Sequence, residues 1–214
     1  MEILPRAVGA WARQVMAASP VLVVEGARQV GKSTLVRMLA DERDVLTTMD
    51  DDVTRAFAHD DPVGFLRSAG DRRLVVDEIQ RCPGLILPLK AEVDRDRRSG
   101  RFILTGSANL LRLANAQDSL AGRAMTIRLQ PFTQAEIAQS TTDWVTSILE
   151  GIAPNAVSSE RVDIVDRVAK GGYPTVQEFT PRLRAAWHRD YTRRLVERDA
   201  ADVAPAQVGA LRQL

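Results

Sequence analysis

The sequence is poor in the residues that build disulfide frameworks and metal clusters. Its 214 residues include one cysteine, Cys82, so an intramolecular disulfide and a multi-cysteine metal site are both excluded. Its two histidines, His59 and His188, lie far apart in the sequence, which argues against a histidine-rich metal site. Because Arg81 is the only basic residue beside Cys82, we expect that thiol to be structural rather than reactive.

Excess charge of one sign and long apolar runs are also lacking. The formal net charge is +1, so no bulk field draws the protein toward nucleic acid or anionic lipid. No stretch approaches 18 apolar residues, and Arg6 interrupts the N-terminus, so neither a transmembrane helix nor a signal peptide is predicted. We therefore expect a cytoplasmic protein without a membrane partner. The 45% hydrophobic content suits one domain of ordinary size with a smaller appendage.

A glycine-rich stretch dominates what is present. It reads Gly26-Ala27-Arg28-Gln29-Val30-Gly31-Lys32-Ser33-Thr34, fits the phosphate-loop pattern G-x-x-x-x-G-K-[ST], and follows an apolar run, 21–24, typical of a buried strand. The two glycines permit backbone angles that let successive N–H groups wrap a polyphosphate. Lys32 is expected to contact the β and γ phosphates and Ser33 to bind Mg²⁺. The alternative is a strand-to-helix turn with an exposed lysine, which the preceding strand disfavours.

A second buried strand, 74–76, ends in two acids, Asp77 and Glu78. Ligands of open parallel sheets bind at the carboxyl ends of the strands. If this strand lies near the phosphate loop, Asp77 can hold Mg²⁺ through water and Glu78 can polarise the attacking water. The alternative is a strand that simply exits into solvent with acidic residues.

A third buried strand begins at Arg101 and ends in small polar residues up to Asn109. Ser107 or Asn109 is the candidate sensor of the γ phosphate, a weak signal strengthened by the preceding acidic strand. Gly106-Ser107 does not fit the G-x-S-x-G elbow, which removes the serine-hydrolase interpretation. Arg123 precedes a predicted strand, 125–129, and could complete an active site in its own chain or across a subunit contact. A surface role for Arg123 stays open.

The remaining acidic and helical patterns are interpreted as structural. The run 50–52 lacks the spaced ligands of a calcium loop, so we expect it to cap a helix rather than bind a metal. Apolar residues at helical spacing predict an amphipathic helix over 3–18, with Trp11 on its packed face; two arginines disfavour membrane-surface binding. Thr133 and Glu136 form a predicted capping box.

The pattern weakens after about residue 139. We place a boundary there, with a core over 1–140 and a helical region over 141–214. Helices are predicted at 161–170 and 181–200. In the second of these, Trp187 and Tyr191 belong to a stripe expected to pack, although its arginines leave a nucleic-acid contact as the alternative.

Five ordered motifs justify a family resemblance. They are Gly26–Ser33, Val76–Gln80, Leu104–Ser107, Ser119–Arg123 and Gly171–Pro174. The chain resembles prokaryotic AAA-type ATPases that usually carry a C-terminal domain of unknown function. The resemblance implies an α/β, three-layer P-loop NTPase sandwich with a parallel sheet of order 5-1-4-3-2, followed by a small helical lid in which Pro174 lies near the nucleotide base. It also implies ATP and Mg²⁺ as cofactors, and a missing C-terminal domain, since the chain stops at Leu214.

The predicted function is Mg²⁺-dependent ATP binding and hydrolysis coupled to an unknown process. ATP is preferred over GTP because of the resemblance and because no N-K-x-D motif is present. A homo-oligomer and a protein or nucleic-acid partner are compatible with this prediction. Two alternatives stay open: a nucleotide-gated signalling or DNA-associated binding module with little turnover, and a small-molecule kinase.

Overall fold

The computed structural model describes residues 3–106, 120–140, 148–151 and 160–199. Its internal contacts divide the chain into two compact units, Met1–Thr141 and Thr142–Leu214, and each is described by itself. This division falls beside the boundary drawn from the sequence, while the roles of core and lid stay predictions.

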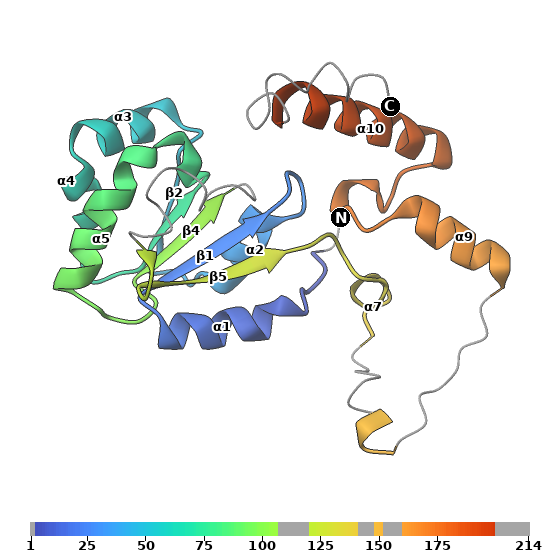
Figure 1. Cartoon of the computed structure of the whole chain (residues 1–214), viewed down its shortest axis with the longest axis horizontal. Helices are drawn as coiled ribbons and strands as arrows, with labels where there is room; N and C mark the ends of the chain where they lie inside the picture. Colours follow the sequence, from blue (N-terminus) through green and yellow to red (C-terminus); the bar gives the residue numbers. More distant parts are fainter. Residues whose placement is uncertain (1–2, 107–119, 141–147, 152–159, 200–214) are drawn as a thin grey trace. The chain divides into compact units, whose positions relative to one another are not determined.

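The first unit is built on a five-stranded parallel sheet in the order β2-β3-β4-β1-β5 (Figure 1). The strands are β1 Val21–Gly26, β2 Val45–Thr48, β3 Leu74–Asp77, β4 Phe102–Gly106 and β5 Ala124–Leu129. The predicted order 5-1-4-3-2 is the same order read from the opposite edge and is confirmed. Strand β1 lies between β4 and β5, which places the segment after it near the middle of the sheet.

Helices cover both faces of this sheet. The helices of this unit are α1 Val8–Ala18, α2 Lys32–Leu39, α3 Asp52–Asp60, α4 Pro62–Arg67 and α5 Ile86–Arg95, with the 3-10 turns η1 Ile79–Arg81 and η2 Pro83–Leu85; the short α7 Gln134–Ile137 follows the end of β5. Val23 of β1 shares a buried cluster with Phe65 of α4 and Leu89 of α5. Because side chains alternate along a strand, Leu22 and Val24 face the other side, where α1 and α2 contact β1. The three-layer sandwich is therefore confirmed.

The central strands are apolar on both faces because both faces are covered. Residues 21–24 are all fully buried, as the uninterrupted apolar run predicts. The edge strand β5 instead alternates near its end, with Ile127 and Leu129 buried and Arg128 between them exposed. This alternation agrees with the half-exposed strand predicted for 125–129.

The N-terminal helix is shorter than predicted. It begins at Val8 rather than at residue 3, because the backbone N–H of Ala7 donates to the Glu136 carboxylate instead of starting a helical ladder. Ala12, Val15 and Met16 face the core, but Trp11 is 51% exposed. The prediction that Trp11 packs on the domain is therefore wrong.

The second unit contains α9 Arg161–Lys170, the 3-10 turn η4 Pro174–Val176, α10 Pro181–Arg194 and a π-helical turn η5 Leu195–Asp199. The ring of Trp187 stacks on Tyr191 at 4.9 Å between centroids, and Tyr173 packs against both. Arg184 of α10 pairs with Asp166 of α9 at 3.0 Å. These contacts hold the two helices of this unit together. Among the residues described in both units, no helix combines the length and apolarity needed to cross a bilayer.

Candidate functional site

The candidate site lies at the edge of the sheet where β1, β3 and β4 end. The carboxyl ends of parallel strands share one edge, and this edge is where open α/β sheets bind ligands. Strand β1 runs into the phosphate loop, residues 26–33, and β3 ends at Asp77. Helix α2 begins at Lys32, so its N-terminus faces the same loop and favours negative charge there.

The two loop glycines are needed for different reasons. Gly31 has φ 96°, in the left-handed region, as predicted. Gly26 has no such angle; a Cβ there would lie 2.5 Å from the carbonyl oxygen of Leu129. The expectation that Gly26 serves an unusual backbone angle is therefore wrong, because the close approach of β5 is what excludes a side chain. Gln29 also adopts a positive φ, 61°, which gives the loop its tight curvature.

Lys32 is folded back over the loop. Its Nζ donates to the carbonyl oxygens of Gly26 and Ala27, at 3.2 and 3.1 Å, and the residue is only 6% exposed. Burial lowers the pKa of the Lys32 ammonium from its usual value, against the opposing influence of Glu78 and Asp77. Both carboxylates thus favour the charged form of Lys32.

Ser33 and Asp77 meet directly. The Ser33 hydroxyl donates to Asp77 Oδ2 at 2.8 Å across 44 residues of sequence. The other oxygen, Oδ1, accepts from the hydroxyl of Thr105 on the neighbouring strand, and that hydroxyl accepts from the N–H of Glu78 at 3.1 Å. The carboxylate is therefore held from both sides, with one oxygen turned toward the start of α2.

Glu78 begins the turn after β3 in a strained conformation. Its φ and ψ are 58° and 42°, a left-handed region that non-glycine residues rarely occupy. Its carboxylate accepts from the amide of Gln80, while Gln80 Oε1 is buried and has no partner among the described residues. The carboxylate of Glu78 is therefore already engaged within its own turn.

The donor set beside Asp77 fits a magnesium ion. A hollow of about 130 Å³ lies next to the Ser33–Asp77 pair, which supplies a hydroxyl and a carboxylate. Thr48 also lines it, and the hydroxyl of Thr47 is engaged by the carbonyl of Val75. The rest of the lining is Val36, Arg37, Leu46 and Val75. Mg²⁺ takes oxygen ligands and keeps several of its waters, and each water occupies about 30 Å³ of liquid volume. The hollow can therefore hold a partly hydrated cation.

Several predicted site residues are not brought to this edge. Arg123 precedes β5, at the amino edge of the sheet, roughly 20 Å from the loop at 3.3 Å per strand residue, and pairs with Asp94 at 2.8 Å. The structure therefore does not place Arg123 in the site of its own chain; a role across a subunit contact stays a prediction. Ser107 and Asn109 lie outside the described residues. Pro174 belongs to the second unit, and its contact with a base also stays a prediction.

The acidic run 50–52 is structural, as predicted. Asp51 caps α3 by accepting from the N–H of Thr54 at 2.7 Å, and Asp52 pairs with Arg55. Asp50 pairs with Arg81. The capping box of Thr133 and Glu136 is likewise present.

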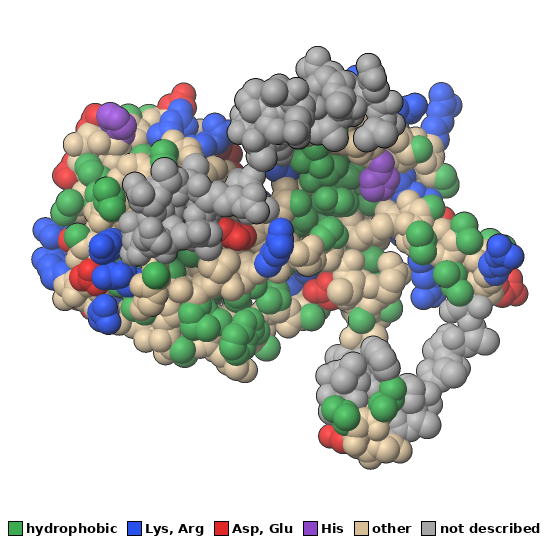
Figure 2. Space-filling model, in the orientation of Figure 1, with side chains coloured by type: hydrophobic (Ala, Val, Ile, Leu, Met, Phe, Trp, Pro, Cys, Tyr) green, Lys and Arg blue, Asp and Glu red, His purple; other side chains and the backbone are tan. Residues whose placement is uncertain are grey.

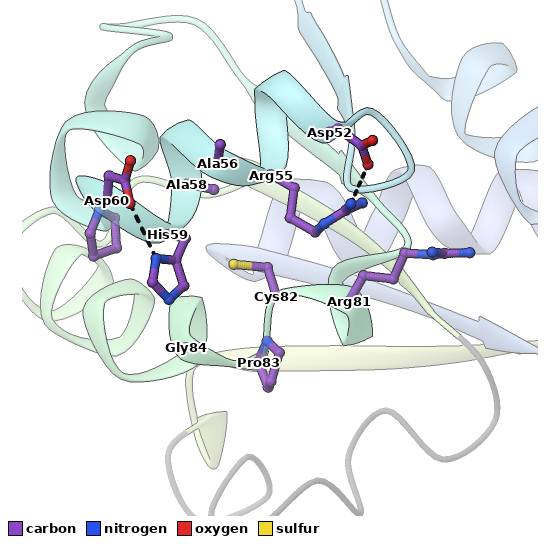
Figure 3. A pocket seen from close by; sticks show the side chains of 11 residues that line it. Asp52, Arg55, Ala56, Ala58, His59, Asp60, Arg81, Cys82, Pro83 and Gly84 are labelled. Atoms are coloured by element: carbon purple, nitrogen blue, oxygen red, sulfur yellow. Dashed lines mark hydrogen bonds and ion pairs between the residues drawn. The ribbon is translucent and has the colours of Figure 1, made fainter.

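A larger hollow of about 730 Å³ lies between α3 and the turn 82–84 (Figure 3). Arg55 and Arg81 reach its rim, but each is paired with an aspartate, so their charge is offset. The thiol of Cys82 lies inside it, and burial raises the thiol's pKa, which agrees with the structural role predicted for this cysteine. The phosphate loop does not line this hollow.

Sequence reasoning missed three residues that shape the site. Ser107 and Asn109 were chosen as candidate sensors instead of Thr105. In the structure Val76 of β3 pairs with Leu104 of β4, so the next residues along the two strands, Asp77 and Thr105, lie side by side. Gln80, the partner of Glu78, carried no signal in the sequence. Arg6, which contacts the loop from the N-terminal segment, had served only to argue against a signal peptide and against membrane-surface binding.

Comparisons with known proteins identify a family and relatives of this chain. The sequence profile of the AAA domain matches residues 18–138. Uncharacterized proteins of Mycobacterium bovis and Mycobacterium tuberculosis are each 29% identical over 208 residues, covering 95% of this chain and 41% of their own length. The chain thus spans about two fifths of these relatives.

A solved structure shares the fold. The Walker-type ATPase of Pyrococcus abyssi superposes with a TM-score of 0.51 at 15% identity, covering 99% of this chain and 76% of its own. The profile covers more than half of the sequence, and its segment contains the phosphate loop, the acidic pair and strand β4. The chain therefore belongs to the AAA-domain family of P-loop ATPases.

Proposed function

We propose that this protein binds ATP together with Mg²⁺ at the phosphate loop and hydrolyses the terminal phosphoanhydride bond. The observation that carries the proposal is the 2.8 Å contact between Ser33 and Asp77 beside the buried Lys32. An ammonium and a hydroxyl from adjacent residues and a carboxylate 44 residues further along the chain then converge where a helix N-terminus also favours anions.

Each residue has a defined task in this proposal. Lys32 exchanges its hydrogen bonds to two loop carbonyls for hydrogen bonds to phosphate oxygens. Because burial disfavours the charged amine in its present environment, the negative phosphate stabilises that charge. Ser33 and Asp77 hold Mg²⁺, which when bound offsets the charge of the phosphate oxygens. Thr105 orients the carboxylate of Asp77, and the loop N–H groups cradle the phosphates.

Glu78 is the proposed general base. It lies in the turn directly after Asp77, so a water bound between it and the terminal phosphate can be deprotonated as the P–O bond forms. Gln80 must first release the carboxylate. The Glu78 side chain then takes the water proton, and ADP and inorganic phosphate leave.

Phosphate release and nucleotide binding, measured on the same samples, test the proposal. Glu78→Gln should lower the release of inorganic phosphate from ATP by 10²-fold or more while the dissociation constant for Mg-ATP stays within a few-fold. Asp77→Asn should abolish the dependence of binding on Mg²⁺. Phosphate release that is the same in the wild type and in Glu78→Gln would contradict the assignment of hydrolysis to this site, and transfer to a small metabolite would indicate a kinase instead.

A nucleotide-gated binding module with little turnover is the second candidate. The contact between Glu78 and Gln80 favours it, because a base held by its own turn is not free to activate water. Gln80→Ala separates the two functions: faster phosphate release would mark Gln80 as a brake on an enzyme. Unchanged, near-background release in both proteins, with intact binding, would support the module.

We propose that nucleotide binding changes how this protein interacts with a second copy of itself or with another macromolecule. On the face of the first unit seen in Figure 2, acidic and basic side chains are interspersed rather than gathered into a basic stripe. This distribution favours a protein partner over nucleic acid, whose phosphates select clustered arginine and lysine. Sedimentation with and without Mg-ATP, and filter binding to DNA at two salt concentrations, distinguish these partners.

A further inference from the structure

Arg6 contacts the phosphate loop from outside the segment that the AAA-domain profile covers. Its guanidinium donates to the carbonyl oxygen of Val30 at 3.0 Å, to that of Gln130 at 2.6 Å and to the Glu136 carboxylate at 3.1 Å. It also lies over the ring of Phe132, 4.5 Å from the centroid. The side chain of Arg6 is 6% exposed, so one buried cation joins the loop to the segment after β5.

Glu136 fixes this cation in place. One carboxylate oxygen accepts from both Arg6 and the N–H of Ala7, and the other accepts from the N–H of Thr133. Burial alone would raise the pKa of Glu136, but these hydrogen bonds outweigh it and lower the pKa, so the pair is charged at neutral pH. A buried ion pair contributes little net stability, and its better-attested effect is to specify one geometry.

The contact with Arg6 fixes the orientation of one loop peptide, the one between Val30 and Gly31. The described residues contain no cis peptide bond, so the carbonyl of Val30 and the N–H of Gly31 point in opposite directions. Since the carbonyl points at Arg6, the N–H of Gly31 points away from it. Gln29 and Gly31, on either side of Val30, both adopt a positive φ, and the helical ladder of α2 begins only at the carbonyl of Gly31, which accepts from the N–H of Leu35 at 2.9 Å.

We propose that Arg6 is a positioning residue for phosphate binding: it holds the Val30 carbonyl on the outer side of the loop and thereby presents the Gly31 N–H to the phosphates. Without Arg6 the peptide can rotate and direct a carbonyl oxygen at the anion. This inference rests on the proposed nucleotide site and adds a residue to it. Because the affected peptide touches phosphate rather than base or attacking water, ADP and ATP binding should suffer alike.

Arg101 is a closely matched control. It too is 6% exposed, pairs with a buried acid, Glu92, donates to a backbone carbonyl at 2.7 Å, and lies 4.8 Å from the centroid of a phenylalanine ring, Phe102. It precedes β4 and so lies at the amino edge of the sheet, away from the phosphate loop. Replacing either arginine removes a similar buried pair, but only Arg6→Ala changes the loop.

Calorimetric titration of Mg-ATP and Mg-ADP into the wild type, Arg6→Ala and Arg101→Ala tests the proposal. Loss of one well-placed donor to a charged phosphate should raise both dissociation constants about 10- to 100-fold in Arg6→Ala. Arg101→Ala should stay within twofold of the wild type, and at saturating ATP the kcat of Arg6→Ala should stay within threefold. A merely structural role for Arg6 would shift the thermal midpoint without this selective loss of phosphate affinity.

Arg6→Lys covers the case in which Arg6→Ala does not fold. A lysine keeps the charge but cannot reach three separate acceptors, so its dissociation constants should lie between those of the wild type and the alanine variant. Normal affinity in Arg6→Lys and Arg6→Ala, or an equal loss in Arg101→Ala, would overturn the role of Arg6 while leaving the nucleotide site intact. Failure of the wild type to bind either nucleotide would instead overturn the proposed function and this inference together.

Discussion

Thr105 offers the sharpest test of the site because one hydroxyl supports two of its groups. The residue is fully buried, its Oγ1 donates to Asp77 Oδ1, and the same oxygen accepts from the N–H of Glu78. Thr105→Val keeps the shape of the side chain but leaves a carboxylate oxygen and an N–H without this partner. Hydrogen bonds to charged groups contribute about 1.5–3 kcal/mol, so the free energy of unfolding should fall by about 2 kcal/mol.

The same substitution should weaken magnesium binding. Partners that orient a metal-binding carboxylate are worth roughly 10- to 100-fold in metal affinity, so the Mg²⁺ concentration that half-saturates ATP binding should rise by about that factor. Urea unfolding measures the first effect, and fluorescent-nucleotide titrations at a series of Mg²⁺ concentrations measure the second.

Thr47→Val provides the control for Thr105→Val. Its hydroxyl donates to the carbonyl of Val75 at 2.7 Å on a neighbouring strand, so its loss should cost about 1 kcal/mol and leave the Mg²⁺ dependence unchanged. A Thr105→Val protein with the wild-type Mg²⁺ half-point would refute the argument that this hydroxyl orients Asp77.

Three further substitutions test separate parts of the structure. Gly26→Ala should destabilise the fold by about 2 kcal/mol in urea, since its Cβ would meet the Leu129 carbonyl at 2.5 Å, whereas Gly84→Ala, with open space, should stay within about 0.5 kcal/mol. Lys32→Met should abolish nucleotide binding. It should also remove a rise in stability with pH: the folded-state pKa of Lys32 is lowered, so the unfolded chain holds the extra proton between that pKa and 10.5, and wild-type stability rises across this window. Glu136→Gln should flatten the acid side of the stability profile. The lowered pKa of Glu136 contributes stability that is present above pH 4.5 and lost as pH falls through the folded-state value, so thermal midpoints between pH 3 and 5 should differ less in the variant.

Most of the sheet could be predicted because its strands are continuous apolar runs. Residues 21–24, 74–76 and 102–104 are buried in the structure, as their uninterrupted apolar sequence predicts. The helix at the N-terminus was predicted too long, since the N–H of Ala7 is engaged by Glu136, 129 positions away. The spacing of apolar residues also put Trp11 on the packed face of this helix, but Trp11 is exposed. Helical spacing alone does not show how much of the helix surface the rest of the protein covers.

The site itself was predicted in part. Ser33 and Asp77 follow from motif and parallel-sheet logic, and they touch. Arg123 was a candidate because of its type and its motif, but a residue that precedes a parallel strand lies at the opposite edge from the loop. Thr105 was missed because a buried threonine in an apolar strand gives no sign of function until its neighbour across the ladder is known.

The sequence by itself determined the phosphate loop, the acidic strand end and the parallel α/β class, because each is encoded in residues that are adjacent along the chain. Only the tertiary structure decided which side chains hold those pieces in register: Thr105 against Asp77, Leu129 against Gly26, and Arg6 against Val30. Such contacts join segments 24 to 103 residues apart, and their formation depends on strand register and close packing, which no local pattern records.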